Sequence, residues 1–180
     1  MIRAFLALPL PVAIVHRLTL VQARLPLPRP TDPEGFHVTL AFLDRQPEPV
    51  LEDLHVALEG LRLPAPRLRL DGLGTFGGAD PDALHARIAP DPALSALSAK
   101  VTQAARGVGI AVKARRFVPH VTLGRFRKGE SNPEALARAM AAVGEVTSDP
   151  WVAPEMILYR STLRHEGPLY DPLATYPLAL

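Results

Sequence analysis

The tetrapeptide His-Val-Thr-Leu occurs twice in this chain, at residues 37–40 and at residues 120–123. The sequence has six histidines, so two of them belong to identical motifs. A histidine can accept or donate a proton near neutral pH, and a neighbouring hydroxyl can donate a hydrogen bond to an anion. Two such pairs suit a reaction that removes a proton on one side of a phosphate and delivers one on the other. The motifs therefore indicate phosphodiester chemistry, and a strained cyclic diester fits best.

Each motif divides into a reactive half and a buried half if it lies on a strand, because side chains alternate between the two faces. In the first copy His37 and Thr39 share one face, while the valine and leucine point to the other. In the second copy His120 and Thr122 share a face in the same way. A single His-x-Thr on a strand is more often a half-buried structural histidine, but two identical copies favour a functional pair.

Metal binding is the main alternative use of two histidines. Each motif supplies one nitrogen, threonine is a poor ligand, and no carboxylate stands two or four residues after either histidine. The chain has no cysteine, which excludes thiolate ligands, cysteine nucleophiles and disulfides. We therefore expect a reaction without a metal or any other cofactor.

The composition fits one globular domain. The chain has 180 residues, 48% of them hydrophobic, which is enough for a sizeable core. No stretch approaches the roughly 20 apolar residues of a membrane span, so we expect no membrane association. Together with the absence of cysteine, this favours a cytoplasmic protein, and we expect a monomer.

Basic residues gather around the second motif although the formal net charge is only +2. They are Lys113, Arg115, Arg116, Arg125, Arg127 and Lys128. A local positive field of this kind attracts phosphate. A solvated face that reflects coding bias is the alternative interpretation, and the role of the cluster stays open.

Hydrophobic patterns predict the elements that must position the motifs. We predict strands over residues 2–8, 36–43, 67–76, 83–89, 117–126, 156–163 and 170–178. We predict helices over residues 11–25, 50–61, 92–108 and 133–143. Asp91 and Asn132 have the side chains and positions of N-caps for the last two helices.

The two halves of the sequence repeat one order of elements: strand, helix, motif-bearing strand, helix, strand. The turn-forming residues 74–83 are the natural seam between them. We therefore predict an α+β fold in one domain, 1–180, with two pseudo-symmetric lobes formed by residues 1–78 and 79–180. Each lobe would be a mostly antiparallel sheet with outer helices, and the two motifs would face each other across a central cleft.

Longer segments give a specific resemblance. They are RAFLALPLP, HVTLAFLD, LRLDGLGTFG, FVPHVTLGRFR and ILYRSTLRHEGPLYDPLATYPL. With the paired motifs, they resemble the LigT-like branch of the 2H phosphoesterase superfamily over nearly the whole chain. That branch contains the RNA 2′,3′-cyclic phosphodiesterases, historically called 2′-5′ RNA ligases.

The resemblance implies a bilobal fold and a metal-free opening of a 2′,3′-cyclic phosphate at an RNA end, such as that of a tRNA fragment, to a 2′-phosphate. It also implies a reversible 2′-5′ joining of RNA. By the same resemblance, His37 is the proton donor to the 3′ oxygen and His120 is the base that activates water. Thr39 and Thr122 hold the phosphate, and Arg125 contacts the phosphate or the RNA backbone.

Two positions do not follow simply from strand geometry. Arg125 and Phe42 each stand five residues after a motif histidine, so a regular strand places them on the opposite face. Only a bulge at Gly124, or a reach around the strand end, would bring Arg125 to the histidines. Phe42 is a candidate substrate contact whose parity favours the core. His85 has no assigned role, and related sequences often carry a tryptophan nearby.

Two other functions remain open at this point. A 2H enzyme that acts on a small cyclic nucleotide would need the same reacting groups. A non-catalytic module that binds RNA ends could use the same surface, although such a module could lose either histidine without penalty. The intact motifs favour catalysis, and the basic residues favour RNA.

Overall fold

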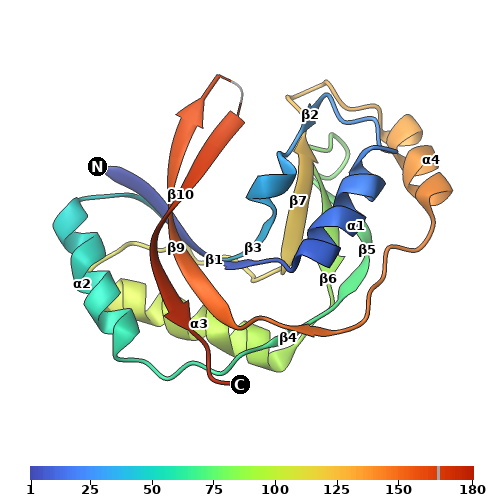
Figure 1. Ribbon diagram of the computed structural model, residues 1–180. Coiled ribbons are helices and arrows are strands. Elements are labelled where there is room, and N and C mark those ends of the chain that lie inside the picture. The colour runs from blue at the N-terminus through green and yellow to red at the C-terminus, as the bar shows by residue number, and fades with distance from the viewer. Residues whose placement is uncertain (166) are drawn as a thin grey trace.

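The computed structural model (Figure 1) describes residues 1–165 and 167–180 of the chain. The longer strands within these residues are β1 (Ile2–Pro9), β3 (His37–Gln46), β5 (Leu70–Phe76), β6 (Ala83–Ile88), β7 (His120–Arg125), β9 (Glu155–Arg164) and β10 (Gly167–Pro177). The short strands are β2 (Arg29–Pro30), β4 (Arg67–Leu68) and β8 (Trp151–Val152). The helices are α1 (Val12–Gln22), α2 (Glu48–Glu59), α3 (Pro92–Gly107) and α4 (Pro133–Val143), with a 3-10 turn at Pro33–Gly35.

The longer strands form two sheets, and each sheet contains one of the two motifs. One sheet has the order β10-β9-β1-β3 and ends at the first motif strand, β3. The other has the order β2-β7-β6-β5 and contains the second motif strand, β7. The paired strands of both sheets are antiparallel. The predicted α+β fold with antiparallel sheets is therefore confirmed.

Helices α3 and α4 begin at the predicted caps. The Asp91 side chain accepts a hydrogen bond from the Leu94 amide at 2.8 Å, and the Asn132 side chain accepts one from the Ala135 amide at 3.0 Å. Caps of this type stabilise a helix by about 1 kcal/mol each. Each helix also has a proline in its first turn, where no amide hydrogen is needed.

Two predicted strands differ from the observed elements. Residues 67–76 form two strands in different sheets, because β4 pairs with β8 whereas β5 pairs with β6. The second motif strand begins at His120 and not at residue 117. The two-residue strands β2 and β8 were not predicted, because so short a segment has no periodic pattern.

The repeat predicted that each half of the sequence would form its own lobe. The two observed sheets instead each combine strands from both halves. The β3 sheet includes β9 and β10 from the end of the chain, and the β7 sheet includes β2 and β5 from the first half. The proposed seam at residues 74–83 is instead the hairpin connection between β5 and β6, which pair with each other. Antiparallel neighbours joined by a short turn satisfy their backbone groups locally, which favours this hairpin over a boundary. That residues 1–180 form a single domain stays a prediction.

The connecting helices also cross between the sheets. Helix α1 follows β1 but contacts β7, and α3 follows β6 but contacts β3. In Figure 1, α1 lies beside β7 and β6, whereas α2 and α3 lie against the sheet that contains β1 and β9. Each motif strand is therefore covered by a helix that arises from the other sheet.

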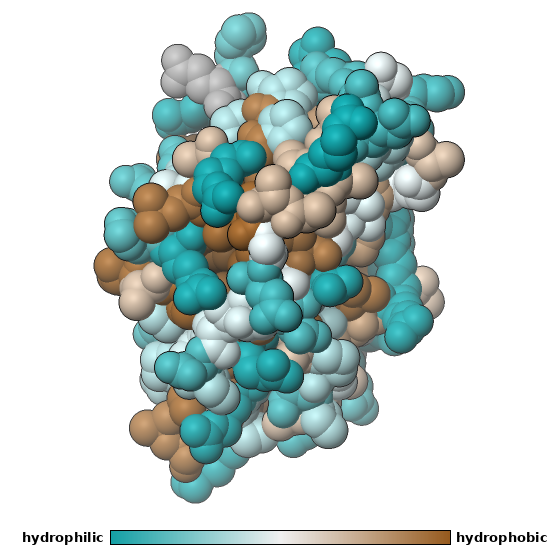
Figure 2. All heavy atoms as spheres, turned by 90° about the vertical axis from the view of Figure 1, so that its right-hand side faces the viewer, coloured by the Kyte–Doolittle hydropathy of each residue, from teal (hydrophilic) through white to brown (hydrophobic). Residues whose placement is uncertain are grey.

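The valines and leucines of both motifs lie in the core, as predicted. Val38, Val121 and Leu123 are 0% exposed and Leu40 is 4% exposed. Burying a side chain of this size contributes about 1.5–3 kcal/mol. On the side of the molecule turned to the viewer in Figure 2, apolar residues gather in the upper half and hydrophilic residues surround them. Among the described residues, no helix is both long enough and apolar enough to cross a membrane.

Candidate active site

The two motif histidines have the same local geometry. Nδ1 of His37 lies 2.7 Å from the carbonyl oxygen of Gly35, and Nδ1 of His120 lies 2.7 Å from that of Val118. A carbonyl oxygen only accepts hydrogen bonds, so Nδ1 carries the hydrogen in both rings. The lone pair of each neutral imidazole is therefore on Nε2, which is the nitrogen available to a substrate.

The hydroxyl groups of the motifs accompany these nitrogens. Nε2 of His37 lies 3.1 Å from Oγ1 of Thr39, and the threonine donates because Nε2 carries the lone pair. Thr39 and Thr122 are both partly buried, as are the histidines. We call the surface of β3 and β7 that carries these four side chains the histidine face.

The pKa values of both imidazoles are lowered from the ordinary value of 6.5. Burial is the main cause for His37, whose pKa falls to about 4, and the charges of His120 and Arg125 lower it further. Burial is also the main cause for His120, and the Arg125 charge again contributes. In both rings the carbonyl that accepts from Nδ1 opposes the shift. Strands β3 and β7 contact each other, so the charge of Arg125 acts on both imidazoles of the histidine face.

Arg125 reaches the histidine face because β7 contains a bulge. In the pairing of β6 with β7, Leu84 lies opposite Gly124 and His85 lies opposite Thr122, so Leu123 is an extra residue. Leu123 and Gly124 are both buried in succession, and Arg125 is exposed. The bulge lies one residue before the predicted position, Gly124, and it reverses the alternation so that Arg125 shares a face with His120.

The same irregularity occurs at the equivalent place in β3. Leu6 pairs with Ala41 and Ala7 pairs with Thr39, which leaves Leu40 as the extra residue. Phe42 is consequently 59% exposed, on the side of His37. The parity-based expectation that Phe42 belongs to the core is wrong, because the bulge at Leu40 places Phe42 on the same face as His37.

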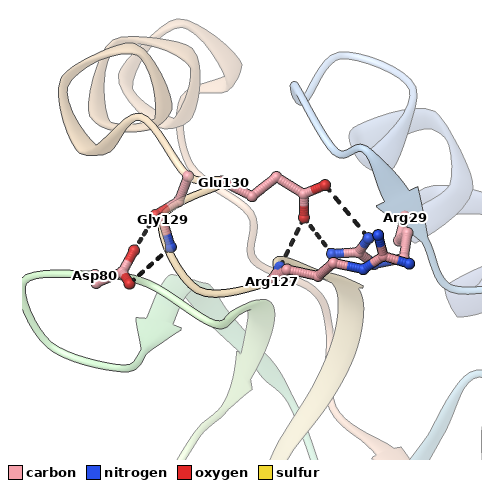
Figure 3. A network of polar contacts seen from close by, with 6 residues as sticks. Arg29, Asp80, Arg127, Gly129 and Glu130 are labelled. Atoms are coloured by element: carbon pink, nitrogen blue, oxygen red, sulfur yellow. Dashed lines mark hydrogen bonds and ion pairs between the residues drawn. The ribbon is translucent and has the colours of Figure 1, made fainter.

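The loop that follows β7 is fixed by carboxylates. The Glu130 carboxylate accepts from the Arg29 guanidinium and, at 2.7 Å, from the Arg127 amide (Figure 3). Asp80 accepts from the Gly129 amide at 2.9 Å in the same loop. Arg29 lies opposite Arg125 in the β2–β7 pairing, and its charge is balanced by Glu130. Within residues 1–165 and 167–180 no carboxylate forms an ion pair with Arg125, so its charge is left to act on the histidine face.

His85 is the third imidazole of this region. It lies opposite Thr122 in the sheet and is only 3% exposed. Its ring stacks on Phe76 at 4.1 Å and lies 5.1 Å from the His120 ring. Burial is the main cause that lowers its pKa to about 4, so it is neutral at neutral pH. Gly74 makes room for it, because a Cβ there would lie 2.8 Å from Nε2 of His85.

Aromatic rings surround His37, and these were not predicted as site residues. Phe5 lies 4.8 Å from the imidazole, Tyr170 lies 5.3 Å from it in an edge arrangement, and Tyr159 lies 6.4 Å away. Tyr159 and Tyr170 come from β9 and β10, so the end of the chain completes the surroundings of the first motif. Their positions within the tail segment that carries the family resemblance were the available signal.

The basic residues do not form one patch. Lys113, Arg115 and Arg116 are exposed in the loop before β7, and Arg127 and Lys128 are exposed after it. At about 3.3 Å per residue, the strand separates the two groups by roughly 20 Å. They therefore lie at opposite ends of β7, with the histidine face between them.

In the part of the chain that the structure describes, no three His, Asp or Glu side chains gather in an arrangement able to hold a metal ion. The groups assembled around the motifs are instead imidazoles, hydroxyls, aromatic rings and one guanidinium. Such a set can move protons and bind an anion without a further group.

Comparisons with known proteins agree on one family. A family profile described as the 2′-5′ RNA ligase superfamily matches residues 11–158. The chain is 35% identical over 150 residues to an RNA 2′,3′-cyclic phosphodiesterase of Geobacillus stearothermophilus. The matched region covers 81% of this chain but only 46% of that protein. It is 30% identical over 142 residues to an RNA 2′,3′-cyclic phosphodiesterase of Aeropyrum pernix, and this matched region covers 78% of this chain and 80% of that protein.

Solved structures show the same fold. E. coli LigT in complex with 3′-AMP superposes with a TM-score of 0.80 at 24% identity and 99% coverage of both chains. A protein of Thermus thermophilus superposes with a TM-score of 0.80 at 26% identity and covers 98% of this chain and 97% of its own. The likeness extends over both sheets and both motif strands.

Proposed function

The chain belongs to the 2′-5′ RNA ligase superfamily, and on that premise we propose that it is an RNA 2′,3′-cyclic phosphodiesterase, a hydrolase that opens a terminal 2′,3′-cyclic phosphate to a 2′-phosphomonoester. The observation that carries the proposal is the pair of imidazoles. Each is fixed through Nδ1 and offers Nε2 on the histidine face. The curated relatives named above support the RNA end as substrate.

The two histidines divide the proton transfers. Nε2 of neutral His120 takes a proton from water, and the water oxygen attacks phosphorus. The bond between phosphorus and the 3′ oxygen breaks, and protonated His37 delivers its proton to that oxygen. The phosphate stays on the 2′ oxygen, and one water is consumed. A general acid and a general base typically contribute about 10²- to 10⁴-fold each.

His37 must be protonated to act as the acid, although its pKa in the free protein is about 4. A bound phosphodiester carries a negative charge, which favours the charged imidazole and raises this pKa. The substrate would therefore bring His37 into its active state. Thr39, which hydrogen bonds to His37 Nε2 in the free protein, would then donate to a phosphate oxygen, and Thr122 would do the same beside His120.

Arg125 and Phe42 would contact the substrate on either side of the reacting bond. The Arg125 charge lowers the pKa of both histidines. The same charge would stabilise the negative charge that develops on the phosphate oxygens. Phe42 is exposed beside His37 and offers a face on which a nucleobase can stack. The bulges in β7 and β3 turn both side chains toward the histidine face.

The same groups can run a joining reaction. If the 5′-hydroxyl of a second RNA replaces water, His120 takes its proton, and the attack on phosphorus leaves a 2′-5′ linkage and a free 3′-hydroxyl. We include this reversible ligation, with tRNA fragments as one source of ends, a monomeric state and a cytoplasmic location. The cysteine-free sequence and the RNA substrate support the cytoplasm.

The test is incubation in excess EDTA with a short RNA ending in 2′,3′-cyclic phosphate, followed by ³¹P NMR of the product. A 2′-phosphate supports the proposal, and a 3′-phosphate would mean that the leaving oxygen and the acid are exchanged. Activity lost in chelator and restored by a divalent ion would contradict the metal-free reaction. Turnover confined to a cyclic mononucleotide would favour a small-nucleotide substrate, and binding without turnover would indicate a binding module.

A further inference from the structure

The bulges at Leu40 and Leu123 each place a buried carbonyl group beside a helix that crosses from the other sheet. Both residues are the extra ones in their strand pairs, and both are buried. A buried carbonyl without a partner is strongly unfavourable. The groups that hydrogen bond to these two oxygens therefore help to fix where each bulge lies.

Both carbonyls are bound by buried polar side chains on the crossing helices. The Gln22 amide, at the end of α1, donates to the Leu123 oxygen at 2.7 Å, as a second donor beside the Thr31 backbone amide at 2.9 Å. Its nitrogen also donates to the Thr31 oxygen at 2.7 Å, so both amide hydrogens are used. The Ser98 hydroxyl, on α3, donates to the Leu40 oxygen at 2.7 Å.

These two side chains stand out from their surroundings. Among the described residues, the buried polar or charged side chains are Gln22, Ser98 and His85. Gln22 is 9% exposed and Ser98 is 6% exposed, on helix faces that otherwise pack apolar side chains against the sheets. Two polar residues that bind equivalent atoms in two separate sheets indicate a shared purpose.

We propose that Gln22 and Ser98 are positioning residues, each holding the bulge that turns the fifth residue after a motif histidine onto the histidine face. Gln22 acts on Arg125 through Leu123, and Ser98 acts on Phe42 through Leu40. Without the bulge the strand would return to simple alternation, and the fifth residue would point to the core side. The inference deepens the proposed function and rests on it for its activity measurements.

The Arg125 side of the proposal is tested with Gln22→Met, which keeps the length of the side chain and removes its hydrogen bonds. The substrate is adenosine 2′,3′-cyclic phosphate, which is too small to depend on remote RNA contacts. We expect kcat to fall by roughly 10-fold or more, toward the loss of about 10²-fold expected for removing a phosphate donor. In the Arg125→Ala background, Gln22→Met should cost less than about 2-fold, because residues that act through one another are not additive.

NMR titration of the histidines gives a readout that needs no turnover. Loss of the Arg125 charge from the histidine face should raise the pKa values of His37 and His120 in Gln22→Met, in the same direction as in Arg125→Ala. Thr19→Val is the matched control, since it removes a side-chain hydrogen bond within the same helix and should change neither kcat nor the titrations. If the wild-type protein does not turn over cyclic phosphates, only the proposed function is contradicted. The histidine titrations still test whether Gln22 positions Arg125.

Ser98→Ala removes a single oxygen and tests the other sheet even if Gln22→Met does not fold. We expect a several-fold rise in KM for RNA with little change in kcat, and no further rise in the Phe42→Ala background. Ser95→Ala, at an exposed position on the same helix, is the control. The proposal would be overturned if the effects of the two single substitutions on kcat or KM multiplied in either double variant. Unchanged histidine pKa values in a folded Gln22→Met protein would also overturn it.

Discussion

Nε2 of His37 lies 3.1 Å from Oγ1 of Thr39, so the threonine hydroxyl occupies the lone pair of this imidazole in the free protein. When Nε2 is protonated, this hydroxyl can no longer donate to it and is free to donate to another acceptor, such as a phosphate oxygen. With its pKa lowered to about 4, His37 is neutral in the free protein at neutral pH, and in the proposed mechanism a bound anion would favour its protonated form.

Loss of either motif histidine should remove catalysis and leave the fold intact. We expect His37→Ala and His120→Ala each to lower kcat on cyclic-phosphate RNA by on the order of 10²- to 10⁴-fold. Both rings are only partly buried, so melting temperatures should change little. His16→Ala, at an exposed position on α1, is the control and should keep full activity. A histidine variant that retains near-normal turnover would refute the two-histidine mechanism.

The pH dependence of kcat/KM should respond to Arg125. Both histidine pKa values are lowered from 6.5, and the Arg125 charge contributes to each shift. Since kcat/KM reports the free enzyme, its optimum should lie on the acid side of 6.5. Removing the positive charge in Arg125→Gln should move the acid and alkaline limbs of the kcat/KM profile to higher pH and lower its maximum value. Limbs that stay in place would mean that Arg125 does not act on the imidazoles.

His85 should make the folded state sensitive to acid. Its pKa is about 4 in the folded protein, against about 6.5 in an unfolded chain. The unfolded state therefore binds the extra proton as pH falls from about 6.5 to about 4, and stability should decline by roughly 1 kcal/mol per pH unit in this window from this group. At higher pH the contribution is fully present. Denaturant unfolding at several pH values should show a shallower decline for His85→Leu, and parallel curves would contradict the assignment.

Phe42 should contribute to RNA binding and not to stability. Because its side chain is 59% exposed, Phe42→Ala should leave the free energy of unfolding nearly unchanged, whereas Phe5→Ala, at 3% exposed, should cost about 3–5 kcal/mol. Base stacking is worth about 1–3 kcal/mol, so KM for RNA should rise about 5- to 150-fold. A large loss of stability in Phe42→Ala would restore the core interpretation.

The basic residues at the two ends of β7 should act on RNA but not on a mononucleotide. Arg115→Ala and Arg116→Ala should weaken RNA binding and reduce its salt dependence by about one counterion each. Turnover of a cyclic mononucleotide should be unaffected. Arg138→Ala, on the exposed surface of α4, is the control for a general change of charge. Equal losses on both substrates would place these arginines at the reacting phosphate instead.

The sequence predicted the features that depend on local patterns. Helices with caps at Asp91 and Asn132 were found where expected, and so were both motif strands. The side on which Phe42 lies was not predicted, because it depends on Ser98, which is 58 residues from Leu40. The bulge in β7 likewise depends on Gln22, which is 101 residues from Leu123. Local alternation cannot reveal a partner that distant in the sequence. For the same reason it did not predict that α1 and α3 each pack against the other sheet.

The pairing of β1 with β9 joins the start of the chain to a strand made much later, since Ala4 lies opposite Arg160. At about 5–20 residues per second, a ribosome needs roughly 8 to 30 s to make the intervening segment. During that time β3 can cover one edge of β1, but the other edge, along a run of buried residues from Ala4 to Leu8, has no partner. The newborn chain therefore exposes an apolar strand edge that favours aggregation or chaperone binding until β9 emerges.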